Sequence, residues 1–286
     1  MLAFTRIPGN AFSFWIRQKL RWSRGRPQLP QESKQDLFAY LENGREPAGS
    51  QPGSFGREAA IAREVELRAR YHLDPLEGAS TQSLYRKNLY LVDLLERSTK
   101  DLNMPIAGRT ALKALDVGAQ DWHYVFALER WLRHHGRQVS LRGVEVDGHG
   151  IYPDFRSRKD YALAYAAQTG NPDVLYRVGD FLADTERDFD IITIFYPFVT
   201  RHHLLLWGLP LRYFQPMKLL SKAADMTRPG GWLVVFTHSR NEHLVFLDLG
   251  RKSEGYELIN EGPALSSLVD FHAEVADRHF SVWRRL

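Results

Sequence analysis

Acidic and aromatic side chains directly follow short apolar runs in this sequence. Glu145 and Asp147 close one run, and Asp180 and Phe181 follow the next. A carboxylate at the first place can accept hydrogen bonds from both hydroxyls of a ribose. Asp180 can accept a bond from an exocyclic amine while Phe181 covers the face of an adenine. These residues predict a nucleoside ligand, with Glu145 preferred to Asp147 for the ribose; Asp180 has an alternative role as a helix N-cap.

Further candidates for chemistry follow the other apolar runs. Gly118 comes directly after the first run, where the missing Cβ lets the backbone approach a ligand closely. Tyr196 follows the fourth run, in Tyr-Pro-Phe, whose phenylalanine we expect to be a core aromatic. Histidine suits proton transfer near neutral pH. His202, His203 and His238 all follow strand ends, and we favour His202 or His203 as the base.

The elements that must position these residues are strands alternating with helices. The apolar runs, each taken together with the residues directly after it, are 111–118, 139–147, 174–180, 189–198 and 231–238. Such alternation predicts an α/β fold with helices on both faces of a parallel sheet, and right-handed crossovers favour a doubly wound topology. Ligands then bind beyond the carboxyl ends of the strands. Strands at 256–260 and 280–285 would complete a mostly parallel seven-stranded sheet, closed by an antiparallel strand.

Five segments occur in an order that resembles class I S-adenosylmethionine-dependent methyltransferases: LDVGAQDW, GVEVD, VGDF, FDIITIFYPF and RPGGWLVVF. The resemblance covers roughly residues 81–286. It implies a Rossmann-like domain, S-adenosylmethionine as the cofactor, and methyl transfer to an acceptor that the sequence does not identify, with a small molecule favoured. In the last segment we expect a tight turn at RPGG before the strand.

By this resemblance Asp116 and Gly118 would line the methionine part of the cofactor, and Tyr196 would face the transferred methyl. The expected catalytic residues are Tyr196, His202 and His203. The expected cofactor-binding residues are Asp116, Gly118, Ala119, Glu145, Asp147, Asp180 and Phe181.

The first loop departs from the family pattern Asp/Glu-x-Gly-x-Gly-x-Gly. Only Gly118 remains, with Gln120 and Trp122 at the other two glycine positions. This departure motivates an alternative, a binding or scaffold protein that keeps the fold without catalysis. A nicotinamide-dependent oxidoreductase is a further alternative, disfavoured because no Gly-x-Gly-x-x-Gly follows the first strand.

The chain divides into a basic tail and linker at 1–56, a helical extension at 57–108 and a Rossmann-like domain at 109–286. The linker is predicted at residues 43–56, which are rich in Gly, Pro and Ser. In the extension we expect a helix at 57–71, in which Ile61, Val65 and Ala69 are spaced four apart. Residues 1–31 contain six Arg or Lys and no acid, with apolar residues at helical spacing. The tail therefore has three interpretations: packing on its own body, binding nucleic acid, or lying on an anionic membrane.

Composition excludes several classes of protein. The 286 residues include no cysteine, which excludes disulfides and thiolate chemistry and fits a reducing compartment. No grouping of His, Asp and Glu has the spacing of metal ligands, so we expect no metal site. The apolar runs are too short for a transmembrane helix, and we expect a soluble cytoplasmic protein.

Overall fold

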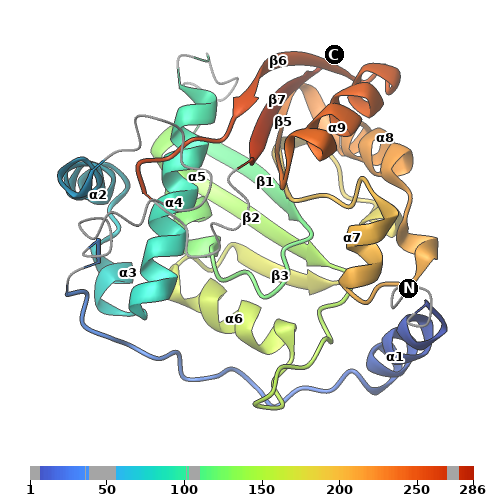
Figure 1. Ribbon diagram of the computed structural model, residues 1–286, viewed down its shortest axis with the longest axis horizontal. Coiled ribbons are helices and arrows are strands. Elements are labelled where there is room, and N and C mark those ends of the chain that lie inside the picture. The colour runs from blue at the N-terminus through green and yellow to red at the C-terminus, as the bar shows by residue number, and fades with distance from the viewer. Residues whose placement is uncertain (1–6, 36, 39–55, 101, 103–109, 269–276) are drawn as a thin grey trace.

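The computed structural model describes residues 7–35, 37–38, 56–100, 102, 110–268 and 277–286. The strands of these residues form a seven-stranded sheet in the order β3-β2-β1-β4-β5-β7-β6 (Figure 1). The strands are β1 (Ala111–Val117), β2 (Gln138–Glu145), β3 (Val174–Val178), β4 (Phe189–Phe195), β5 (Thr227–Thr237), β6 (Tyr256–Pro263) and β7 (His279–Arg285).

The sheet is doubly wound, and its strand order reverses between β1 and β4. Strands β1 to β5 run parallel to one another. The sheet is nevertheless mixed rather than parallel throughout, because β7 runs antiparallel to both β5 and β6. The tight turn predicted at RPGG is wrong. Phe189 pairs with Thr227 and Ile191 with Trp232, so Gly230, at φ 76°, lies in a bulge within β5.

Helices cover both faces of the sheet. On one face lie α4 (Gln82–Thr99), α5 (Val125–His135) and α6 (Arg158–Gln168), and on the other lie α8 (Pro216–Met226) and α9 (Arg240–Lys252). Alternation along β4 shows the division, because Ile191 packs into the cluster of α4 and α5 while Ile192 packs with Leu220 of α8 and Phe246 of α9. Both faces of β4 are buried, as a strand covered on two sides requires.

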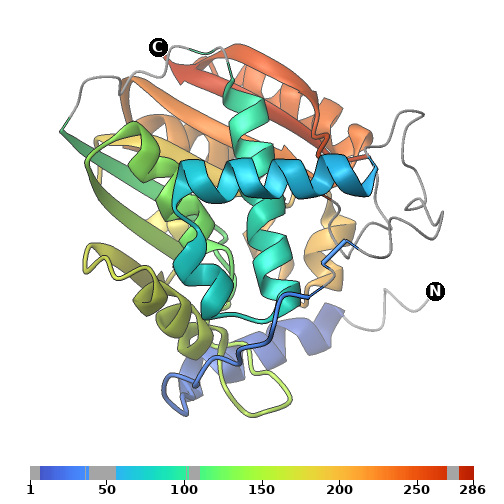
Figure 2. The same cartoon turned by 90° about the vertical axis from the view of Figure 1, so that its left-hand side faces the viewer.

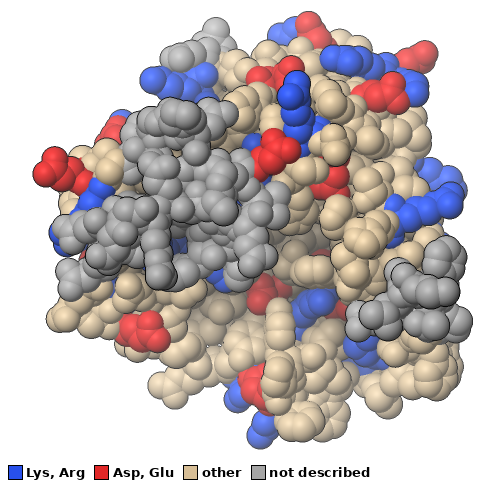
Figure 3. Space-filling model, in the orientation of Figure 1, with Lys and Arg blue, Asp and Glu red and all other residues tan. Residues whose placement is uncertain are grey.

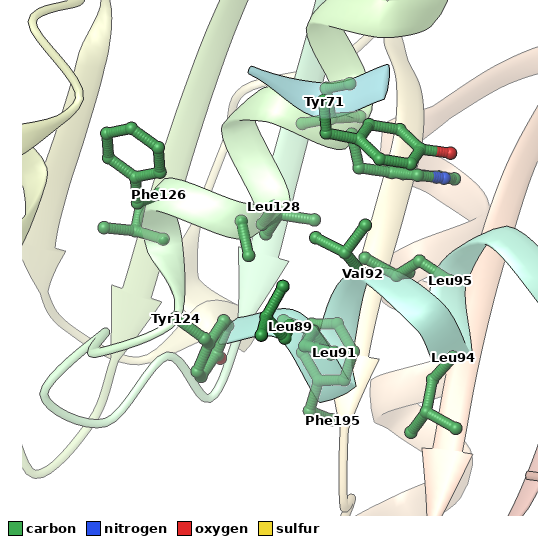
Figure 4. Packing of buried hydrophobic residues seen from close by; sticks show 14 of the residues in the cluster. Tyr71, Leu89, Leu91, Val92, Leu94, Leu95, Tyr124, Phe126, Leu128 and Phe195 are labelled. Carbon is green, nitrogen blue, oxygen red and sulfur yellow. The ribbon is translucent and has the colours of Figure 1, made fainter. Parts of the chain in front are cut away.

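The first two helices of the extension, α2 (Arg57–Tyr71) and α3 (Asp74–Gly78), pack on the side of the sheet that α4 and α5 cover. Leu89, Val92 and Leu95 of α4 gather opposite Leu128 of α5, with Tyr71 of α2 above them (Figure 4). The extension thus shares its hydrophobic core with the sheet. The predicted linker at 43–56 lies outside the described residues except for Gly56.

The helix predicted at 57–71 is present as α2, but the apolar residues spaced four apart along it are not its buried face. Ile61 and Val65 are exposed, and α2 instead buries Ala60, Leu67 and Tyr71. The sequence of α2 offers two apolar stripes, and contact with α4 and α5 selects one of them.

The basic tail forms α1 (Ile7–Leu20), which docks beside α7 (Arg201–Leu206). Phe14 is buried against Leu204 and Leu209. Figures 1 and 2 both show α1 at the edge of the molecule, next to the loop before α6. Packing on its own body is therefore one role of the tail. Within the part of the chain that the structure describes, no helix is long and apolar enough to cross a membrane.

Candidate functional site

A cleft lies at the carboxyl ends of the parallel strands, where the strand order reverses. Its empty space, counted out to the open mouth, is about 1100 Å³. Each of the five parallel strands contributes a residue at or just beyond its end. These residues are Gly118, Glu145, Asp180, Tyr196 and His238.

Glu145, the last residue of β2, is the best-fixed acid in the cleft. Its carboxylate is 4% exposed; Oε2 accepts a hydrogen bond from the Gln120 amide at 3.0 Å and Oε1 one from the Asp147 amide at 2.7 Å. Burial raises the pKa of Glu145, against the opposing attraction of Arg158. A carboxylate offers about four lone-pair sites, so each oxygen retains capacity for one hydroxyl of a vicinal diol.

The loop after β1 keeps the backbone of a glycine loop with few glycines. Gly118, Gln120 and Trp122 have φ values of 78°, 54° and 57°. Trp122 is fully buried under β2, close to Gly143, so it leaves the cleft open, whereas Gln120 lines it. No atom lies within 4 Å of the position that a Cβ on Gly118 would occupy. The loop therefore presents its backbone to open space there.

Asp116 lies outside the cleft lining and supports this loop from below. Its carboxylate is fully buried and accepts hydrogen bonds from the Trp122 indole, the Tyr124 hydroxyl and the Thr193 hydroxyl. Burial raises the pKa of Asp116 to about 7, against the effect of these donors. Ala119 is also fully buried outside the lining, and its amide donates to the β2 backbone. The structure thus corrects the expectation that both residues face the cofactor.

Asp147 also lies outside the lining, contrary to its predicted role. Its two oxygens accept hydrogen bonds from Nε and Nη2 of Arg17, both at 3.0 Å, and Arg158 approaches to 3.4 Å. The carboxylate is 2% exposed. Docking of α1 therefore pairs Asp147, two residues beyond the end of β2, with Arg17, and Glu145 is the acid that remains for the cleft.

Asp180 and Phe181 both line the cleft at the end of β3. One oxygen of Asp180, Oδ1, accepts the Leu182 amide at 2.9 Å and so caps the short helix η2 (Phe181–Ala183). The capping role expected as an alternative is present, and the residue still lies in the lining. Phe181 is buried behind it.

Tyr196 and His238 form a stacked pair in the cleft, with ring centroids 4.0 Å apart. Burial, with the charges of Arg278 and His203, lowers the pKa of His238 to about 4. The backbone of Tyr196 is left-handed, with φ 61°. A bulky residue in this conformation is uncommon and is typical of functional sites.

The favoured histidines lie outside the lining. His202 is exposed on α7. His203 pairs with Glu242 at 2.7 Å, and the other oxygen of Glu242 accepts the amide of His238. His238, the third candidate of the sequence, is therefore the histidine that reaches the cleft.

Sequence reasoning missed the aromatic wall of the cleft. It comes from η3 (Leu211–Tyr213), α8, α9 and the loops on either side of α7. Phe198, expected to be a core residue, lines the cleft as well as packing near α1. The wall comprises Phe198, Trp207, Leu209, Tyr213, Pro216, Leu219 and Phe246.

Comparison of the sequence with models of protein families and with curated proteins found no match. Solved structures similar to this chain include S-adenosylmethionine-dependent methyltransferases. A TehB-like enzyme from Corynebacterium glutamicum has 18% identity and a TM-score of 0.43, over 79% of this chain and 99% of that one. The N-methyltransferase NodS from Bradyrhizobium japonicum, solved with S-adenosyl-L-homocysteine, has 15% identity and a TM-score of 0.43, over 78% and 98%.

Proposed function

We propose that this chain is an S-adenosylmethionine-dependent methyltransferase whose acceptor is a largely apolar small molecule. The observation that carries the proposal is the convergence of Gly118, Glu145, Asp180 and Phe181 on one cleft at the strand-order reversal. The strand order supports it too. In a dinucleotide-binding oxidoreductase the sixth strand extends the parallel sheet, whereas here β7 enters antiparallel between β5 and β6.

The residues present fit this cofactor. Glu145 offers free lone pairs to a ribose diol, and the open face of Gly118 leaves room for close approach by a ligand. Asp180 and Phe181 combine a hydrogen-bond acceptor with an aromatic ring for an adenine. When bound, S-adenosylmethionine supplies an activated methyl group. The protein must then orient the acceptor and exclude water.

The aromatic wall supports an apolar acceptor. Trp207, Tyr213 and Phe246 belong to this wall, and a site lined in this way favours rings and alkyl groups. Phe14 of α1 packs into the cluster that includes Phe198 and Leu209, so the docked tail backs the wall. His238 beside Tyr196 is neutral near pH 7, because its pKa is lowered to about 4. It can therefore accept a proton from a hydroxyl or amine of the acceptor.

Calorimetric titration with S-adenosyl-L-homocysteine tests cofactor binding. We expect the wild-type chain to bind and Glu145→Gln to bind roughly 10-fold to 150-fold more weakly, because a hydrogen bond to a charged group contributes about 1.5–3 kcal/mol. Glu257→Gln is the matched control, since that exposed carboxylate lies on β6. Unchanged circular dichroism checks that the loop held by Glu145 remains folded. Absent binding, or equal binding by both variants, would contradict the proposal.

Methyl transfer itself needs a second measurement. We expect labelled methyl from S-adenosylmethionine to appear in the organic-soluble, low-mass fraction of a cell extract, and His238→Asn to reduce that transfer while cofactor binding persists. If the cofactor binds but no fraction becomes labelled, the alternative of a non-catalytic binding protein replaces the enzyme.

A further inference from the structure

The outer face of α1 is apolar, although α1 already packs on the body. Toward the body, α1 turns Phe14 and the polar side chains of Asn10, Arg17 and Gln18. These polar groups bind the carbonyl of Leu205, the carboxylate of Asp147 and the carbonyl of Val146, respectively. Toward solvent it turns Phe12 and Trp15, which are 63% and 53% exposed and stack on each other, and Leu20. A helix stabilised only by docking would present the opposite arrangement.

Basic side chains flank this outer face. Lys19, Arg21, Arg24 and Arg26 are all exposed, and residues 1–31 contain no acid. Elsewhere on the face drawn in Figure 3, by contrast, acidic and basic groups are interspersed. Lys and Arg side chains gathered beside exposed aromatic residues attract an anionic partner.

A second exposed aromatic group continues from the end of α1. The Trp22 indole donates to the carbonyl of Phe155 at 2.8 Å, and Arg24 donates to the carbonyl of Asp154 at 3.0 Å. Phe155 is 66% exposed and has φ 63°, and Ile151 of the same loop is 46% exposed. A bulky side chain held outward at positive φ departs from ordinary backbone preference.

We propose that these residues form an interfacial face that binds an anionic lipid membrane. The interfacial face comprises Phe12, Trp15, Lys19, Leu20, Arg21, Trp22, Arg24, Ile151 and Phe155. Phe12, Trp15 and Leu20 lie along one side of the 14-residue helix α1, the pattern of a helix that lies in the plane of the headgroups. Trp22 and the loop residues Ile151 and Phe155 continue this surface beyond the end of α1. Trp suits this depth because its ring is amphipathic, and Lys and Arg match anionic headgroups.

A lipid surface explains the face better than a nucleic acid does. Nucleic acids are bound by aromatic side chains that stack on bases. Here Phe12 and Trp15 stack on each other, and the aliphatic Leu20 and Ile151 have no use in base stacking. The proposal is independent of the reaction in the cleft.

Vesicle co-sedimentation of the full chain tests the interfacial face. We expect binding to vesicles of phosphatidylcholine with phosphatidylglycerol, and little binding to phosphatidylcholine alone. The double variant Phe12→Ser/Trp15→Ser should bind at least about tenfold more weakly, because two large side chains no longer leave water. Lys19→Gln/Arg21→Gln should also bind more weakly and lose much of the salt dependence.

Val65→Ser is the matched control, since Val65 is equally exposed, at 55%, but lies on α2. It should bind as the wild type does. All replaced side chains are exposed, so the variants should keep the wild-type melting temperature. The proposal is overturned if the wild type does not bind anionic vesicles, or if Phe12→Ser/Trp15→Ser binds them as strongly as the wild type does. Binding of an RNA oligonucleotide that needs Phe12 and Trp15, without vesicle binding, overturns it as well.

Discussion

The ion pair between Arg17 and Asp147 should hold α1 against the body. It is bidentate, with both contacts at 3.0 Å, and Arg17 is 22% exposed while Asp147 is 2% exposed. Arg17→Ala would leave a buried carboxylate with Arg158 at 3.4 Å as its remaining cation. Breaking a fully buried pair costs about 3–5 kcal/mol. The partial exposure of Arg17 and the presence of Arg158 lower the expected cost to roughly 2–3 kcal/mol.

Hydrogen exchange of the α1 amides measures this cost. A loss of roughly 2–3 kcal/mol in local opening should speed exchange of residues 14–20 about 30-fold to 150-fold. Asp147→Asn should cost less than Arg17→Ala, since the released Arg17 can reach water. The double variant should be less destabilised than the sum of the two single variants.

Two results would refute this reasoning. One is unchanged exchange in Arg17→Ala, which would mean that Phe14 and the carbonyl contacts hold α1 without the pair. The other is strict additivity in the double variant, within about 0.5 kcal/mol, which would mean that the two charges do not interact.

Three further predictions concern stability and titration. Because burial raises the pKa of Asp116 to about 7, the folded state binds a proton that the unfolded state has lost, so Asp116 lowers the free energy of unfolding as pH rises from about 4 to about 7. Urea denaturation should show that Asp116→Asn removes this decline, and an identical pH profile would contradict it. The pKa of His238 is lowered to about 4 from an ordinary value of 6.5, so His238 should lower the free energy of unfolding as the pH falls below about 6.5. An NMR titration midpoint of the His238 ring near 6.5 would disprove this prediction. Leu67→Ala should cost about 2–5 kcal/mol in thermal or urea unfolding, while Ile61→Ala, its exposed neighbour on α2, should stay within about 0.5 kcal/mol; equal losses would refute the assigned packing face.

The strand ends of the sheet could be predicted from the sequence. Apolar runs such as the one in β4 are long enough to require burial on both faces, and their alternation with helices leaves few topologies. This placed Gly118, Glu145, Asp180 and Tyr196 at one edge, and all of them line the cleft. The aromatic wall could not be predicted in this way, because most of its residues lie on helices and loops beyond the strand ends, and their packing has no local signal.

The sequence also could not predict which face of α2 is buried. Leu67 and Ile61 are both apolar, and contact with α4 and α5 decides which one is buried. Likewise, the sequence could not show where the side chain of Trp122, at a glycine position of the loop, would lie. The absence of a side chain at Gly143, on a neighbouring strand, gives the indole a place under the sheet.

The two acids at the end of β2 show what the local sequence pattern cannot predict. Glu145 and Asp147 are two residues apart, and alternation along a strand assigns such residues to the same side. The sequence therefore predicted a carboxylate at this edge and favoured Glu145, but the local pattern gives no reason why Asp147 is excluded. Arg17, from a helix 130 residues earlier, binds Asp147 and leaves Glu145 in the cleft. That choice belongs to the tertiary structure, because a charge is neutralised by whichever partner the folded chain brings within hydrogen-bonding distance.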